Sequence, residues 1–142
     1  MHISTFEAIC SSCQQTFHIP QLTNAAYGVF LYFSTDGQTV GYIEAIDHPV
    51  WNRVEKIQQL SVPEVGEMIR RVIGRLADVP SKNEYFVTNI ICLHCGAIVQ
   101  QVDTNNKVDA LEIKPLQFQY FNALTDDEQQ GRIQSILDTY CK

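Results

Sequence analysis

The sequence has no long hydrophobic run and no export signal. Its longest apolar stretch, Tyr27–Phe33, has seven residues and includes a glycine, whereas a membrane-spanning helix needs about 20. The first residues, Met1–Glu7, lack the basic start and apolar core of a signal peptide. We therefore expect no membrane partner and a cytoplasmic protein, whose thiols meet a reducing environment.

The sequence also has few basic residues. The chain has 10 lysines and arginines against 16 acidic residues, for a formal net charge of −6. Such a balance repels phosphate backbones and disfavours non-specific nucleic-acid binding, but it suits a partner protein with a basic surface. Hydrophobic residues make up 45% of the 142 residues. We expect one domain over residues 1–142 with a hydrophobic core of its own.

The common catalytic motifs are missing as well. The chain has no His-Glu-x-x-His, no Gly-x-Ser-x-Gly and no phosphate-binding glycine loop. Zinc deaminases carry a Cys-x-x-Cys, but they also need a proline before it and a separate His-x-Glu. Here Ile91 precedes Cys92, and no His-x-Glu occurs. The sequence therefore predicts a protein that is not an enzyme.

Four of the five cysteines form two Cys-x-x-Cys pairs. They are Cys10 with Cys13 and Cys92 with Cys95. Two-residue spacing lets one tight turn present both sulfurs to a single ion, and two such turns supply the four soft ligands of a closed tetrahedral zinc site. Gly96 directly after the second pair suits a chain that bends sharply as it leaves the turn.

These motifs resemble those of zinc-ribbon proteins, in which two Cys-x-x-Cys hairpins share one metal. The resemblance implies one structural Zn²⁺ held by Cys10, Cys13, Cys92 and Cys95, and it names a metal site without naming a function. The separation differs from the family pattern: residues 14–91 lie between the pairs, where about 15–20 residues are usual. Gln14 also stands where many such turns have glycine. We expect the inserted residues to form the body of the domain.

Other residues could change the ligand set or the chemistry. His94 lies inside the second pair, His18 follows the first, and Cys141 is left over near the C-terminus. We expect His94 to be solvated, His18 to be a polar residue at a strand edge and Cys141 to be a bystander at a helix end. A thioredoxin-like pair would open a helix, which lowers the thiol pKa, and neither pair here precedes a helical pattern.

The remaining patterns predict an α+β fold with a mainly antiparallel sheet, about three helices and a zinc-ribbon-like pair of hairpins. The expected strands are 6–9, 16–19, 27–33, 40–46, 85–91, 97–102 and 111–113. Asp36-Gly37 predicts a hairpin turn in which both residues have positive φ.

Three patterns predict where helices begin. Asp47 is the expected cap of a helix with Pro49 in its first turn, and Ser61 with Glu64 forms a capping box for a second. Thr125 with Glu128 forms the capping box of the last helix. We assign no secondary structure to the aromatic segment 118–121, which either covers the core edge or binds a partner.

The leading functional hypothesis is a non-enzymatic zinc-binding protein that acts by binding another protein. It would be a small regulator, or an inhibitor of a basic partner such as a nuclease toxin. A nucleic-acid-associated regulator that uses Arg70, Arg71 and Arg75 is the first alternative. The plainer interpretation is that these arginines complement the helix dipole, with Arg71 paired to Glu67. A Cys-x-x-Cys thiol–disulfide protein is the second alternative.

Overall fold

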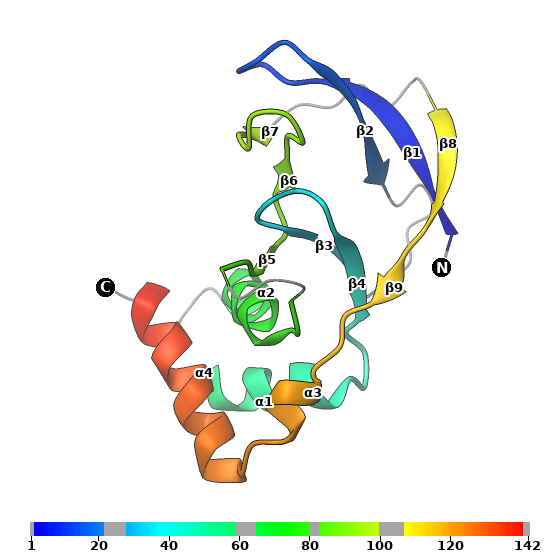
Figure 1. Cartoon of the computed structure of the whole chain (residues 1–142). Coiled ribbons are helices and arrows are strands. Elements are labelled where there is room, and N and C mark those ends of the chain that lie inside the picture. Colours follow the sequence, from blue (N-terminus) through cyan, green and yellow to red (C-terminus); the bar gives the residue numbers. More distant parts are fainter. Residues whose placement is uncertain (1, 22–27, 59–64, 80–82, 100–106, 141–142) are drawn as a thin grey trace.

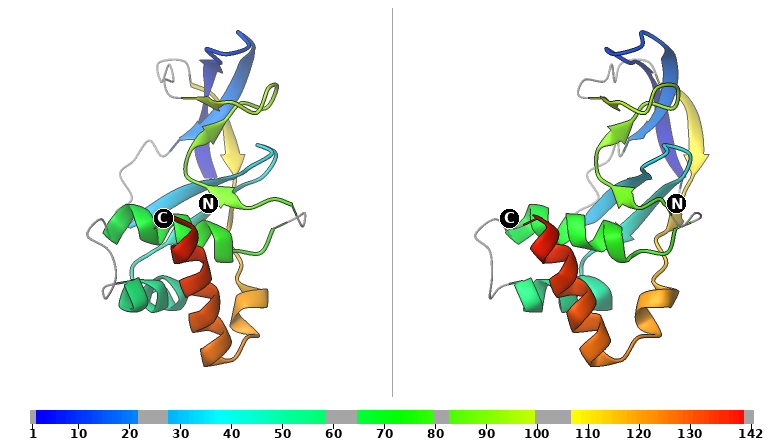
Figure 2. Two further views of the ribbon diagram at one scale, coloured as in Figure 1. Left: turned by 90° about the vertical axis from the view of Figure 1, so that its left-hand side faces the viewer. Right: turned by 60° about the vertical axis from the view of Figure 1, so that its left-hand side comes forward.

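The computed structural model describes residues 2–21, 28–58, 65–79, 83–99 and 107–140. Its helices gather at one end of the molecule and its short hairpins at the other, with a sheet between them (Figures 1 and 2). The described residues form four helices, three of them substantial, and small sheets that are mostly antiparallel. The α+β class predicted from the sequence is confirmed.

The first sheet contains the first expected hairpin and a late strand. Its order is β2-β1-β8, from β1 (His2–Ile9), β2 (Thr16–Gln21) and β8 (Lys107–Glu112), and both pairings are antiparallel. Along β1, Ala8 is buried while Glu7 and Ile9 are exposed, as the two-residue period of a strand requires. The alternation breaks where Thr5 and Phe6 are both buried, and the pairing with β8 shifts register between these two residues.

The second sheet lies between the hairpins and the helices. Its order is β5-β3-β4-β9, from β3 (Val29–Ser34), β4 (Val40–Glu44), β5 (Phe86–Val87) and β9 (Lys114–Pro115). Among the described strands of this sheet, β4 and β9 pair in parallel and the other neighbours are antiparallel. The third sheet is the antiparallel hairpin of β6 (Ile90–Ile91) and β7 (Ile98–Val99).

The turn between β3 and β4 is the hairpin that Asp36-Gly37 predicts, with one correction. Gly37 has a φ of +76°, and its N–H donates to the Ser34 carbonyl at 2.8 Å. Asp36 does not have positive φ, so that part of the prediction is wrong. Its carboxylate instead accepts hydrogen bonds from the Ser34 hydroxyl and the Gln38 N–H, which holds Asp36 in an ordinary turn conformation.

The helices are α1 (Pro49–Gln58), α2 (Val65–Leu76), α3 (Gln119–Asn122) and α4 (Asp126–Tyr140). One core joins α1, α2 and α4 to the sheet, and among its fully buried members are Tyr32 of β3, Val54 of α1, Ile73 of α2 and Ile133 of α4. Figure 1 shows α2 lying across the end of this sheet, between it and α4.

The helix starts differ from the sequence predictions in one place. His48, not Asp47, caps α1, because its Nδ1 accepts a hydrogen bond from the Val50 N–H at 3.2 Å. Asp47 has a φ of +59° and bends the chain before the cap, so the prediction that it caps the helix is wrong. Thr125 and Glu128 do form the predicted capping box.

Two further predictions concern other helices. The expected box of Ser61 and Glu64 lies outside the described residues. The aromatic segment 118–121, left without secondary structure by the sequence, contributes to the short helix α3, in which Phe121 is buried in the core.

Gly74 allows α2 to approach β5 closely. A Cβ atom added at Gly74 would collide with the backbone carbonyl oxygen of Phe86 and would lie 3.2 Å from the Tyr32 ring. Because a backbone oxygen in a paired strand cannot move aside, only glycine fits here. This contact brings the helical core against the strand that leads to the second cysteine pair. No helix within the described ranges is long and apolar enough to cross a membrane.

Candidate metal centre

The two Cys-x-x-Cys turns have the same backbone design. The Cys10 N–H donates to the Gln15 carbonyl at 3.0 Å, and the Gln14 N–H donates back to the Cys10 carbonyl at 2.8 Å. In the second turn, the corresponding bonds of Cys92 with Ala97 and with Gly96 are 2.9 and 3.0 Å long. Each turn closes a hairpin, β1–β2 or β6–β7. The hairpin ladders therefore fix where each pair of sulfurs lies.

Both turns leave the cysteine pair through a residue of positive φ. Gly96 has a φ of +76°, as its place after the second pair predicts, and Gln14 has a φ of +64°. Gln14 adopts this strained conformation with its side-chain Nε2 donating to the Ser11 carbonyl at 3.0 Å. The turn therefore forms without the glycine that usually occupies this position.

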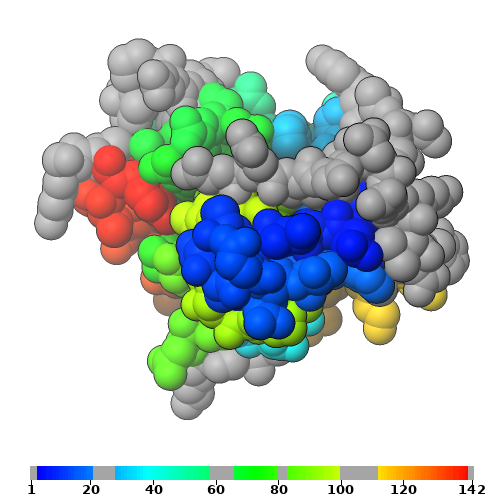
Figure 3. Space-filling model, turned by 90° about the horizontal axis from the view of Figure 1, so that it is seen from above, coloured from blue at the N-terminus to red at the C-terminus, as the bar shows by residue number. Residues whose placement is uncertain are grey.

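The two turns face each other and bring the four sulfurs together. The Cys10 and Cys95 Sγ atoms are 3.7 Å apart, the Cys13 and Cys92 Sγ atoms are also 3.7 Å apart, and all four lie within 4.8 Å of one another. Figure 3, seen onto this end of the molecule, shows the first hairpin against the residues of the second.

These distances fit a metal centre and not a disulfide. Four sulfurs about 2.3 Å from a central zinc are about 3.8 Å apart at the corners of a tetrahedron. A disulfide would bring two sulfurs to about 2.05 Å, and all four thiols are free. The four cysteines form a cluster that fits one metal ion.

The four cysteines differ in how deeply they are buried. Cys10 and Cys92 are each 1% exposed and belong to a small core with Phe6, Phe17 and Val99. Cys13 is half-buried and Cys95 is exposed. The first cysteine of each pair therefore anchors the site in the hairpin core, and the second lies towards the surface.

Backbone N–H groups favour one thiolate in this cluster. The Cys13 N–H and the Ser12 N–H both favour the ionised Cys10, and together with smaller contributions from Cys92 and Cys95 they outweigh burial and lower the pKa of Cys10 to about 6. In the second turn, the His94 N–H donates to the Cys92 Sγ at 3.4 Å. Such N–H donors also disperse the charge of metal-bound thiolates.

Two of the four thiols, Cys13 and Cys95, resist ionisation when no cation is present. The Gln15 N–H favours the Cys13 thiolate, but burial and the neighbouring sulfurs outweigh it and raise the pKa of Cys13 to about 12. The pKa of Cys95 is also raised: the Ala97 N–H favours its thiolate, but burial and the sulfurs of Cys10 and Cys92 outweigh it. A divalent cation at the centre would reverse this order, since it stabilises every thiolate around it.

The histidines near the pairs stand outside the cluster. His94 is exposed, as predicted, but its Nε2 lies 3.2 Å from the Thr16 carbonyl of the opposite hairpin, a contact that the sequence did not predict. His18 is exposed on β2 opposite Glu7. Neither belongs to the group of potential ligands found among the described residues. Cys141 lies outside them.

Each of the three arginines of α2 contacts another side chain of the molecule. Arg71 forms the predicted pair with Glu67, with 2.7 Å between nitrogen and oxygen. The Arg75 guanidinium lies 3.6 Å from the centroid of the Tyr85 ring. The Arg70 guanidinium lies over the ring of Phe30 in β3. The three arginines therefore contact three different side chains, those of Glu67, Tyr85 and Phe30.

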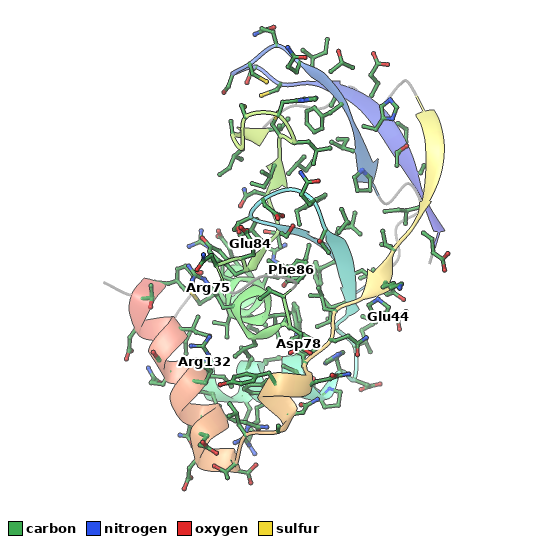
Figure 4. The ribbon with its side chains drawn as sticks, in the orientation of Figure 1. Glu44, Arg75, Asp78, Glu84, Phe86 and Arg132 are labelled. Atoms are coloured by element: carbon green, nitrogen blue, oxygen red, sulfur yellow. The ribbon has the colours of Figure 1, made fainter. Side chains whose placement is uncertain are left out.

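A cleft of about 480 Å³ lies beside α2 and α4, among charged side chains. Figure 4 shows Arg75, Asp78, Glu84 and Arg132 around it. Asp78 accepts hydrogen bonds of 2.8 and 3.1 Å from N–H groups at the start of α3, and Glu84 accepts one from the Thr35 hydroxyl. These carboxylates hold the fold together, and no cysteine lines the cleft.

Comparison with known proteins adds no family. Family models, curated protein sequences and solved structures were each searched, and none matched this chain. The class defined by the site is that of proteins with two Cys-x-x-Cys turns around one candidate metal position.

Proposed function

We propose that the four cysteines hold one structural Zn²⁺ and that the protein works by binding another protein. The observation that carries the metal assignment is the set of four sulfurs within 4.8 Å of one another, presented by two matched turns. Four protein thiolates complete a tetrahedral zinc site and leave no position for water or substrate. A closed site of this kind supports a structural role and disfavours a catalytic one.

The metal would join two parts of the chain that are distant in sequence. The first hairpin begins near the N-terminus, and the second follows the helical body, so zinc would tie β1–β2 to β6–β7 across the insertion. The core shared by these hairpins is small, with seven buried members among the residues that the structure describes. A metal cross-link would supply the stability that so few apolar contacts cannot provide.

The lowered pKa of Cys10 favours an alternative function, thiol–disulfide exchange. A catalytic thiolate must also be reached by its substrate, however, and Cys10 is only 1% exposed. The exposed thiol is Cys95, whose pKa is raised. Low pKa and exposure therefore fall on different cysteines, which supports metal binding over redox catalysis.

Alkylation of Cys95 distinguishes these functions. Because Cys95 is exposed, burial alone does not protect it from alkylation, and a rate that rises when a chelator is added reports a bound metal. We expect alkylation, followed by peptide mass mapping, to be at least about ten-fold slower in the purified protein than after chelator. A Ser135→Cys variant places a control thiol on the exposed surface of α4 and should react quickly in both conditions. Equal rates at Cys95 with and without chelator would contradict the zinc proposal.

The protein-binding part of the proposal needs its own experiment. The acidic balance of the chain and its lack of catalytic motifs support a protein partner, including one with a basic surface. Cross-linking in cells that naturally produce the protein, followed by mass spectrometry, should recover a defined partner with the wild type and less with Cys92→Ser. A well-behaved chain that recovers no partner would count against this function.

A further inference from the structure

One edge of the central sheet is open next to β5. The Ala45 N–H donates to the Gly28 carbonyl, and the Ser34 N–H donates to the Thr39 carbonyl. In an antiparallel pair of strands, every second residue directs its N–H and C=O groups towards the partner strand. Gly28 and Ser34 both face β4, so Phe30 and Tyr32, which lie between them at two-residue steps, face β4 as well. The residues between them, such as Val29 and Leu31, direct theirs to the opposite side.

On that opposite side, β5 pairs only with the C-terminal end of β3. The pairing consists of Phe33 with Val87 and Ser34 with Phe86, and it stops there because residues 88 and 89 bend away towards β6. Among the described residues, no strand pairs with Val29 or Leu31 on this side. Their N–H and C=O groups form a short open edge, with the spacing that an added strand would use.

Two outward positions on the edge of β2 are protected by specific residues. The Cys10 N–H donates to the Gln15 carbonyl, so Gln15 and every second residue after it along β2 face β1. The residues between them, which include Thr16 and Pro20, direct their backbone groups outward. The Thr16 carbonyl lies 3.2 Å from the His94 ring nitrogen, and Pro20 has no N–H to offer. Along the open edge of β3, the described part of the chain places neither a proline nor a side-chain contact to a backbone carbonyl at Val29 or Leu31.

A groove of about 360 Å³ lies along this open edge. Its walls include Pro20 of β2, Phe30 and Leu31 of β3, and Ile90 of β6, so side chains on both faces of an added strand would meet apolar surface. Arg70 of α2 is the charged residue among the described residues that line it. Val29, Phe30 and Leu31 are each only half-buried, whereas the other half of β3 is buried.

Arg70 gives the groove a preference for negative charge. Its guanidinium lies 5.4 Å from the centroid of the Phe30 ring, and Phe30 in turn stacks on Trp51 at 5.2 Å between centroids. Arg70 has no carboxylate partner among the described residues. A half-buried guanidinium that is held on an aromatic ring and lacks a counter-ion is suited to bind a carboxylate.

We propose that this edge binds an extended segment of a partner protein, which adds to the sheet as a strand beside Val29–Leu31 and places a carboxylate on Arg70. The inference rests on the proposed protein-binding function and names its site. Backbone bonds to Val29 and Leu31 supply affinity, the groove selects alternating apolar residues, and Arg70 selects an acidic side chain or a chain terminus.

Panning a linear random-peptide phage library on the full chain, loaded with zinc, tests this site. We expect enriched peptides that alternate apolar residues and carry a carboxylate, and a synthetic copy should bind in fluorescence polarisation. Leu31→Pro removes an outward N–H without breaking the ladder to β4 and should weaken binding at least about ten-fold. His18→Pro removes an outward N–H on β2 and should leave the affinity unchanged.

Two matched variants test whether Arg70 gives the groove its preference for a carboxylate. Arg70→Gln should weaken binding of the acidic peptide about ten-fold, whereas Arg71→Gln, at the neighbouring exposed arginine, should change it less than two-fold. Circular dichroism and zinc content confirm that each variant is folded.

Three outcomes would overturn the inference. They are a library without enrichment, peptides whose affinity is unchanged by Leu31→Pro, and a concentration-dependent dimer that Leu31→Pro abolishes, since the edge would then bind a second copy of the chain. If cross-linking recovers a partner that Leu31→Pro still binds, the protein-binding function stands and only this site is wrong.

Discussion

Gln14 and Gly96 occupy equivalent positions in the two cysteine turns, and both have positive φ, +64° and +76°. Each donates its N–H to the carbonyl of the first cysteine of its pair. The two hairpins therefore present their sulfurs in the same way, although their sequences share little beyond the cysteines. One of them does so with a residue that is strained in this conformation.

This equivalence predicts opposite effects of two substitutions. Gln14→Gly should stabilise the metal-loaded protein by about 0.5–1 kcal/mol, because relief of positive-φ strain outweighs the greater freedom of the unfolded chain. Gly96→Ala should destabilise it by about 1 kcal/mol for conformational reasons alone, since no atom lies within 4 Å of an added Cβ. Urea unfolding with zinc present measures both. Equal effects of the same sign would show that the turns are not equivalent.

Gly74 and Gly66 provide a second contrast within one helix. Gly74→Ala should cost about 3 kcal/mol, because its methyl group would meet the Phe86 carbonyl and force α2 away from β5. Gly66→Ala meets nothing within 4 Å and should stabilise the helix by about 0.5–1 kcal/mol. Thermal unfolding of both variants tests this, and a neutral Gly74→Ala would mean that the close approach is wrong.

The capping box of α4 predicts a pH dependence. The Thr125 N–H, and then the Thr125 hydroxyl, keep the pKa of Glu128 below its ordinary value of about 4.5. A lowered folded-state pKa contributes stability that is complete above the ordinary value and is lost as the pH falls through the lowered pKa. Glu128→Gln should therefore reduce stability at neutral pH and converge on the wild type in acid. A deficit that persists unchanged in acid would contradict this assignment.

The matching substitution on the other side of the box is Thr125→Ala. It removes the acceptor of the Glu128 N–H bond and should cost about 1 kcal/mol. Urea unfolding at neutral pH measures the loss, and Thr139→Ala, near the end of the same helix, serves as a control outside the cap.

Removal of the metal should affect the two cores differently. Cys10 and Cys92 belong to the small hairpin core and Cys13 packs against it, whereas no cysteine among the described residues belongs to the larger core around α2 and α4. With chelator, amides of β6–β7 should therefore lose protection from hydrogen exchange while those of α2 and α4 keep theirs. Simultaneous loss in both regions would show that the metal holds the whole fold.

The sequence predicted the cysteine turns because their signal is local. Cys-x-x-Cys spacing and the flanking β-like residues predict the two hairpins, and the chain brings Cys10 close to Cys95 and Cys13 close to Cys92. Which sulfur lies nearest which depends on how the hairpins face each other. That arrangement is set by the body between them, so spacing alone could not reveal it.

The wrong helix cap was predicted where two side chains could cap the same backbone N–H groups. Asp47 and His48 both precede Pro49, and the sequence rule favours aspartate as the cap. The structure gives that role to His48, whose ring packs edge-on against Phe118 at 5.4 Å. The open edge of β3 could not be predicted at all, because it depends on where β5 stops.

The most direct test of the central claim is native mass spectrometry of the full chain, purified without a histidine tag, before and after acid. We predict one zinc per chain, retained in His94→Ala and lost in Cys92→Ser. A metal-free chain that is two or four protons lighter than the reduced mass would mean disulfides in place of a metal centre, and it would contradict the account.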